Sequence, residues 1–116
     1  MDNLDKETKA QIYYITKPFF EEAMLLCSFK NKLNWQEEGS SLMSWKYQKV
    51  SETKCIDLNK IYKYYKGWNG NRHTRLAGHR SITVGDIVVI GDNVRLITGM
   101  GWLTIPTYVW KYIKKV

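Results

Sequence analysis

Short apolar runs separated by glycine-containing turns follow one another near the end of the chain. The runs are Ile87–Ile90, Val94–Thr98 and Trp102–Ile105, with Gly91-Asp92-Asn93 and Gly99-Met100-Gly101 between them. Such turn residues permit the positive φ that tight connections between paired strands require. This segment predicts three consecutive, mainly antiparallel strands.

Two earlier strands and a first helix are expected upstream of that segment. Residues 11–16 are rich in β-branched and aromatic residues, and residues 44–50 alternate between apolar and polar; both patterns indicate strands. Between them we expect a helix over about 17–30. Thr16 would supply a hydroxyl cap, and Pro18 fits the first turn because its missing N–H costs nothing there. Residues 31–43 are interpreted as a loop.

Two more helices complete the prediction. Asp57 can cap a helix whose apolar residues recur at helical spacing, namely Leu58, Ile61, Tyr62 and Tyr65. Pro106 can open a short terminal helix with Val109 and Ile113 packed inward. The expected order is β-α-β-α-β-β-β-α, which favours a small α+β domain with about three helices on a mainly antiparallel sheet. The length of 116 residues fits one domain, over 10–116, with 1–9 as a frayed N-terminus.

Composition indicates a cytoplasmic protein with no membrane contact. The longest strongly apolar run, Ile87–Ile90, is far shorter than the ~20 residues of a membrane span, and the charged N-terminus does not resemble a signal peptide. Cys27 and Cys55 have no metal-like spacing, so we expect reduced thiols, no metal site and no cofactor.

Positive charge is concentrated in the second half of the chain. Residues 1–56 contain eight acids and eight bases, whereas residues 57–116 contain three acids and ten bases, so the net charge of +7 lies there. Such a block is typical of a surface that contacts phosphate or an acidic protein, or of a solvated face that maintains solubility.

A long polar loop near residues 66–80 is the predicted binding segment. Its lysines and arginines can neutralise phosphates, and Trp68 could stack on a base, anchor a protein interface or fold the loop onto the core. The predicted partner- or phosphate-binding residues are Lys60, Lys63, Lys66, Trp68, Arg72, Arg75, His79 and Arg80. Composition alone does not separate a protein partner from direct nucleic-acid binding.

Catalysis is the weakest hypothesis. His73 and His79 lie among arginines, which disfavour an imidazolium, and no neighbouring carboxylate is positioned by the sequence to orient either ring. A metal-independent nuclease that uses both histidines stays open as a low-weight alternative. We therefore assign no catalytic residues.

The segment Ser81-Ile82-Thr83-Val84-Gly85-Asp86 is the most distinctive motif. Its hydroxyl and carboxylate side chains can hydrogen-bond neighbouring backbone and fix a tight entry into the following strand. With Gly78 before it and Gly101-Trp102 after it, the motif resembles that of the YodL-like domain family. The residues assigned to this structural motif are Gly78, Ser81, Thr83, Gly85, Asp86, Gly101 and Trp102.

The resemblance covers most of residues 45–109 and implies a setting rather than a chemistry. Domains of this family occur in bacteria, phages and conjugative elements, often alongside counter-defence or accessory functions. The chain departs from many relatives at 71–75, where Asn-Arg-His-Thr-Arg replaces an acidic or proline-containing stretch. The resemblance therefore implies a non-enzymatic accessory protein of a phage or mobile element. The expected partner is then a host protein or nucleoprotein complex, with direct nucleic-acid binding through the basic segment as the alternative.

Overall fold

The computed structural model describes residues 9–28, 34–54, 56–66 and 82–116, and of residues 64–66 the backbone alone. The strands are β1 (Ala10–Ile15), β2 (Lys46–Thr53), β3 (Ile87–Ile90), β4 (Asn93–Thr98), β5 (Gly101–Thr104) and β6 (Lys114–Lys115). The helices are η1 (Lys17–Phe19, a 3₁₀ turn), α1 (Phe20–Cys27), α2 (Trp35–Ser44), α3 (Leu58–Lys66) and α4 (Thr107–Trp110).

The strands form one open sheet in the order β5-β4-β3-β1-β2-β6. All neighbouring strands are antiparallel except β2 and β6, which are parallel. The predicted α+β class with a mainly antiparallel sheet is therefore confirmed. The register between β1 and β2 shifts after Ile12, so Val50 is an extra residue on β2 and forms a β-bulge.

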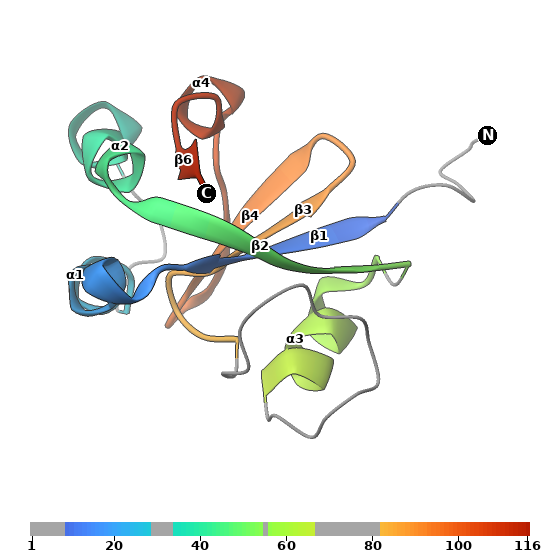
Figure 1. The fold of residues 1–116 in the computed structure, drawn as a ribbon. Helices are drawn as coiled ribbons and strands as arrows, with labels where there is room; N and C mark the ends of the chain where they lie inside the picture. Colours follow the sequence, from blue (N-terminus) through green and yellow to red (C-terminus); the bar gives the residue numbers. More distant parts are fainter. Residues whose placement is uncertain (1–8, 29–33, 55, 67–81) are drawn as a thin grey trace.

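Helices cover both faces of this sheet (Figure 1). On one face α1, α2 and α4 bury Ala23, Leu42 and Val109 against strand residues that include Tyr47 and Leu96. On the opposite face α3 buries Ile61 against a second cluster that includes Ile12, Val88 and Ile97. Alternation along β1 and β3 supplies both clusters, since successive side chains point to opposite faces.

The loop predicted at 31–43 is wrong, because α2 lies there. Asn34 caps this helix: its Oδ1 accepts hydrogen bonds from the backbone N–H groups of Gln36 (3.0 Å) and Glu37 (3.4 Å), and its own N–H donates to Glu38 Oε1 (2.9 Å). Glu37 and Ser40 lie on the solvent side of this helix. Its inner side packs on α4, where a Cβ at Gly39 would lie 3.4 Å from a methyl group of Val109.

Two smaller expectations also need correction. The Thr16 hydroxyl makes no capping bond; it donates to the carbonyl oxygen of Lys46 (2.9 Å) and so fastens the end of β1 to β2. The terminal helix is only Thr107–Trp110, and Lys114 and Lys115 form β6 beside β2 instead of extending it. The order thus gains a helix and a short strand over the predicted one.

Candidate functional site

Lys60 and Lys63 lie on the solvent side of α3. The helix begins where the Asp57 carboxylate accepts hydrogen bonds from the N–H groups of Asn59 (2.9 Å) and Lys60 (3.2 Å). This cap, which the sequence predicts, fixes the rotation of the helix so that Ile61 is buried and both lysines are exposed.

An aromatic contact holds α3 on the sheet. The ring of Tyr62 meets that of Trp102 on β5 edge to face, with 6.3 Å between centroids and 84° between ring planes. Gly101, just before Trp102, has φ +126°, a backbone conformation that favours glycine and that lets the β4–β5 turn close. The helix that carries Lys60 and Lys63 is therefore held in place on the sheet.

The other predicted binding residues lie outside the described part of the chain. These are Trp68, Arg72, Arg75, His79 and Arg80, together with the side chain of Lys66. His73, Gly78 and Ser81 also lie outside it. The structure places Lys60 and Lys63 on the exposed side of α3. That the other basic residues lie on the same face stays a prediction.

Asp86 is the centre of the motif before β3. Its buried carboxylate accepts hydrogen bonds from the N–H of Thr83 (2.9 Å) and from the N–H of Ile15 at the end of β1 (2.9 Å). Its own N–H donates to the Thr83 carbonyl (3.1 Å), and its carbonyl accepts from the N–H of Ile97 (2.9 Å). One residue thereby fixes a tight turn and joins β1 and β4 to it.

Gly85 lets the same turn approach helix α1. It has φ +98°, and a Cβ at this position would lie 2.9 Å from the Cβ of Ala23. Its carbonyl accepts a 2.6 Å hydrogen bond from the buried Tyr47 hydroxyl on β2. The backbone groups of Thr83 and Gly85 and the carboxylate of Asp86 therefore join elements of the fold.

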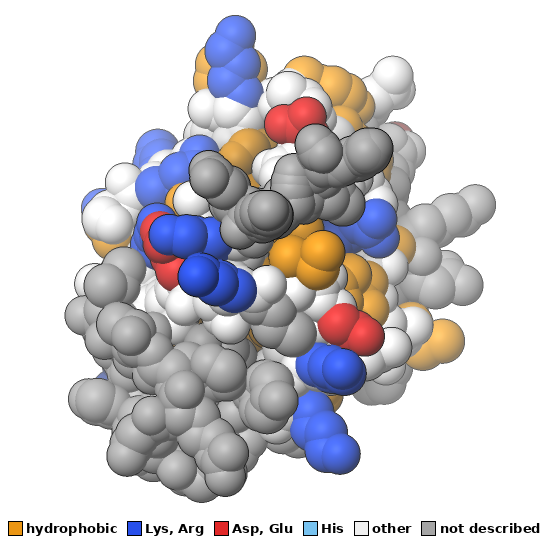
Figure 2. All heavy atoms as spheres, turned by 90° about the vertical axis from the view of Figure 1, so that its right-hand side faces the viewer, with side chains coloured by type: hydrophobic (Ala, Val, Ile, Leu, Met, Phe, Trp, Pro, Cys, Tyr) orange, Lys and Arg blue, Asp and Glu red, His pale blue; other side chains and the backbone are white. Residues whose placement is uncertain are grey.

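At the far end of β2 the positive charges are partly neutralised. Lys49 donates a hydrogen bond to Glu52, and the Lys9 ammonium lies 3.9 Å from the same carboxylate. The hydrogen bond from Lys49 and its charge hold the pKa of Glu52 below the ordinary value. Figure 2 looks onto this end of the molecule, where lysine and arginine side chains lie in separate groups with acidic side chains beside some of them.

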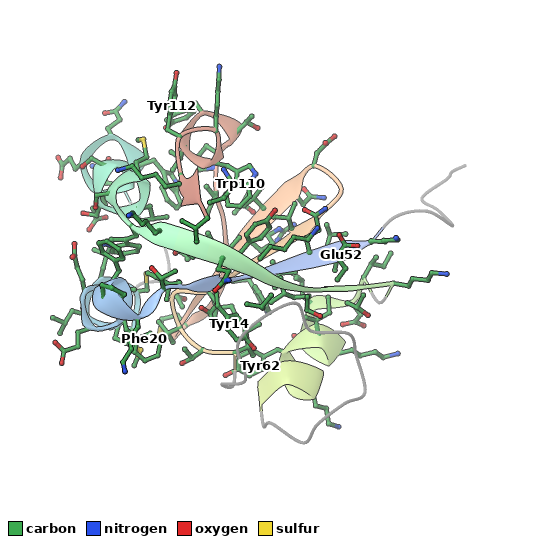
Figure 3. The ribbon with its side chains drawn as sticks, in the orientation of Figure 1. Tyr14, Phe20, Glu52, Tyr62, Trp110 and Tyr112 are labelled. Atoms are coloured by element: carbon green, nitrogen blue, oxygen red, sulfur yellow. The ribbon has the colours of Figure 1, made fainter. Side chains whose placement is uncertain are left out.

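A second surface, which the sequence interpretation missed, consists of Tyr108 on α4 and of Lys111 and Tyr112 just after this helix. Lys111 and Tyr112 are exposed, and the Lys111 ammonium lies 5.7 Å from the centre of the Tyr112 ring. In Figure 3 Tyr112 projects away from the sheet, whereas Trp110 lies over it. The spacing Tyr108-x-x-Lys111-Tyr112 is the signal that could have indicated this surface.

Lys115 contacts the segment next to that surface. Its ammonium lies 4.1 Å from the centre of the Trp110 ring and donates to the carbonyls of Trp110 (3.0 Å) and Ile113 (2.8 Å). Burial lowers the pKa of this ammonium. The Trp110 ring also meets that of Tyr13 edge to face, with 5.2 Å between centroids. These contacts hold residues 110–115 against the sheet.

In the ranges that the structure describes, no group of three or more histidine, cysteine or acidic side chains could hold a metal ion, and no helix is long and apolar enough to cross a membrane. Cys27 is buried in the core.

Comparison with known proteins identified no relative. No family model, no curated protein and no solved structure matches the chain. The YodL-like resemblance therefore rests on the sequence motif and stays a prediction.

Proposed function

We propose that the chain is a non-catalytic binding domain that engages a macromolecule of a bacterial host, as an accessory protein of a phage or mobile element. The proposed target is a host protein or nucleoprotein complex that acts on nucleic acids. Binding would modulate this target and so counteract a host defence. The observation that carries the proposal is the presentation of Lys60 and Lys63 on one exposed side of α3.

The geometry of α3 supports recognition through its cations. Its inner face is fixed by Ile61 and by the Tyr62–Trp102 contact, so little conformational freedom of the helix is lost on binding. Within the described residues neither Lys60 nor Lys63 forms an ion pair. Both charges can attract an acidic partner and raise its association rate.

The polar groups of the distinctive motif support a non-catalytic reading. A general base needs access to a substrate proton, whereas the Asp86 carboxylate is buried and bonded to the N–H groups of Ile15 and Thr83. A direct contact between the 60–80 segment and nucleic acid is the alternative, because exposed lysines also neutralise phosphates.

The test is capture of a partner from host lysate on the immobilised full chain, with and without nuclease treatment. Lys60→Ala with Lys63→Ala should reduce capture, and the charge-matched control Lys111→Ala with Lys114→Ala should leave it unchanged. A partner that survives nuclease supports the proposal, whereas one lost after nuclease supports direct nucleic-acid binding. Equal capture by both double variants would refute a role for α3.

The predicted loop is tested in the same assay. Trp68→Ala and Arg75→Ala separate an aromatic anchor from a charge contact, because loss of a hydrophobic anchor raises the dissociation rate whereas loss of a rim charge lowers the association rate. If neither change weakens the captured complex or binding to RNA or DNA, the 66–80 segment is a solvated connection.

A further inference from the structure

Strand β5 forms one edge of the sheet, because among the described strands it pairs with β4 alone. In an antiparallel pair, alternate residues turn their backbone groups toward the neighbouring strand. The N–H of Ile105 donates to the Val94 carbonyl (2.8 Å), and by this alternation Leu103 also faces β4. Trp102 and Thr104 therefore turn their N–H and C=O groups away from β4, and within the described residues these groups have no partner.

The β5 edge lacks the features that keep a sheet edge from pairing with another chain. At the opposite edge, β6 has only two residues and both are lysines; short length and positive charge are two such features. The β5 sequence Gly-Trp-Leu-Thr carries no charge, and neither a proline nor a bulge interrupts it. This edge can therefore accept a further strand, which is one of the ways in which domains bind extended peptides.

Arg95 on β4 supplies a charge that can select the added strand. It lies opposite Val88 on β3 and Thr104 on β5, on the face of the sheet that α3 covers. The side chain of Arg95 is half-buried, and its buried Nε has no hydrogen-bond partner among the described residues. In the same ranges Arg95 forms no ion pair. Because an unpaired cation is costly to bury, this position favours an anionic ligand.

We propose that β5 binds an extended acidic peptide segment of another protein, which adds to the sheet as an antiparallel strand with a carboxylate opposite Thr104. Neighbouring strands lie about 4.8 Å apart, so the acidic residue is roughly 10 Å from the Arg95 backbone. Threonine is short, and the long side chains of an arginine and a glutamate can meet across it. The backbone of β5 provides affinity, and Arg95 provides the preference for an acidic sequence.

A second copy of this chain does not meet these requirements. Pairing of β5 with the same strand of another copy brings no carboxylate to Arg95, because Gly101–Thr104 contains no acidic residue. The net charge of +7 also opposes self-association. The inference goes beyond the proposed function, because β5 is a different surface from the lysines of α3 and is tested without a host partner.

The test is a titration of the isotope-labelled full chain with the peptide Val-Glu-Val-Glu-Val-Glu, followed by its backbone amide NMR signals. Those of Trp102 and Thr104 should shift most, and those of β6 should not move. With the glutamates on the α3 face, antiparallel pairing points the glutamate N–H groups at β5. N-methylation of the glutamates should therefore weaken binding at least about tenfold more than N-methylation of the valines.

Two variants test the residues that carry the proposal. The parent should bind the peptide about tenfold more tightly than its glutamine counterpart Val-Gln-Val-Gln-Val-Gln, and Arg95→Gln should remove most of this preference. Lys114→Gln, at the opposite edge, is the charge-matched control and should keep it. Thr104→Pro removes an outward N–H without removing a bond to β4, and it should weaken binding of the glutamate peptide about tenfold or more.

Four results would overturn the inference: no shift at Trp102 and Thr104 with millimolar peptide, equal affinity for the glutamate and glutamine peptides, equal effects of the two N-methylations, or an equal loss of preference in Lys114→Gln. A dimer of the parent that dissociates in Thr104→Pro would assign the edge to a second copy and overturn it as well. Far-ultraviolet circular dichroism checks that each variant is folded. Should a variant unfold, the comparison of the peptides on the parent decides.

Discussion

Substitution of Asp86 by alanine removes a buried carboxylate that accepts two hydrogen bonds of 2.9 Å from the N–H groups of Ile15 and Thr83. Each hydrogen bond to a charged group contributes about 1.5–3 kcal/mol, and alanine leaves both donors without this acceptor. Relief from burying the charge offsets part of the loss. We therefore expect the free energy of unfolding to fall by about 3 kcal/mol, against the ~1 kcal/mol that a purely local turn bond would contribute.

Urea unfolding followed by circular dichroism measures this change. With a slope of about 1.5 kcal/mol per molar, a loss of about 3 kcal/mol moves the midpoint down by roughly 2 M. Asp86→Asn keeps one acceptor oxygen and should fall between the parent and Asp86→Ala. Asp92→Ala, in the exposed β3–β4 turn, is the control for loss of an aspartate and should change stability little. If Asp86→Ala unfolds at the same midpoint as Asp92→Ala, the assignment of Asp86 as a junction is wrong.

Two further outcomes follow from backbone geometry and from the proposed absence of catalysis. Gly85→Ala should lower the free energy of unfolding by roughly 2–5 kcal/mol in chemical denaturation, because positive φ and the 2.9 Å approach to Ala23 both oppose a Cβ. Gly91→Ala, with φ +60° and no atom within 4 Å of the new Cβ, should cost only about 1–2 kcal/mol; equal losses would contradict the steric argument. His73→Ala with His79→Ala should abolish no turnover, so multiple-turnover cleavage of RNA or DNA that disappears in this variant would show a nuclease.

Local signals were sufficient to predict most of the strands and α3. The Gly91 and Gly101 turns do have positive φ, and Asp57 does cap α3. These features depend on a few neighbouring residues, so they can be inferred without knowing what packs above them. The class of the fold follows from such elements once their approximate order is known.

Long-range packing explains what the sequence did not show. Serines and Gly39 give α2 a low intrinsic propensity, and its stability depends on contact with Val109 of α4, which the chain reaches much later. The two residues of β6 carry no strand pattern and owe their conformation to pairing with Lys46 and Tyr47. The surface of Tyr108, Lys111 and Tyr112 was not predicted for the same reason, since the exposure of the two tyrosine rings depends on which neighbouring residues are buried.

The separation of the two lysine pairs makes the capture assay informative. Lys60 and Lys63 stand on α3, which packs on one face of the sheet, whereas Lys111 follows α4, which packs on the opposite face, and Lys114 lies on β6 at the edge of the sheet. Substitutions that are well separated and share no partner generally have additive effects. Both double variants lose two positive charges, so an effect of net charge alone would lower host-partner capture equally in both. Loss of capture in the Lys60 and Lys63 variant alone therefore comes from the surface that carries these two lysines.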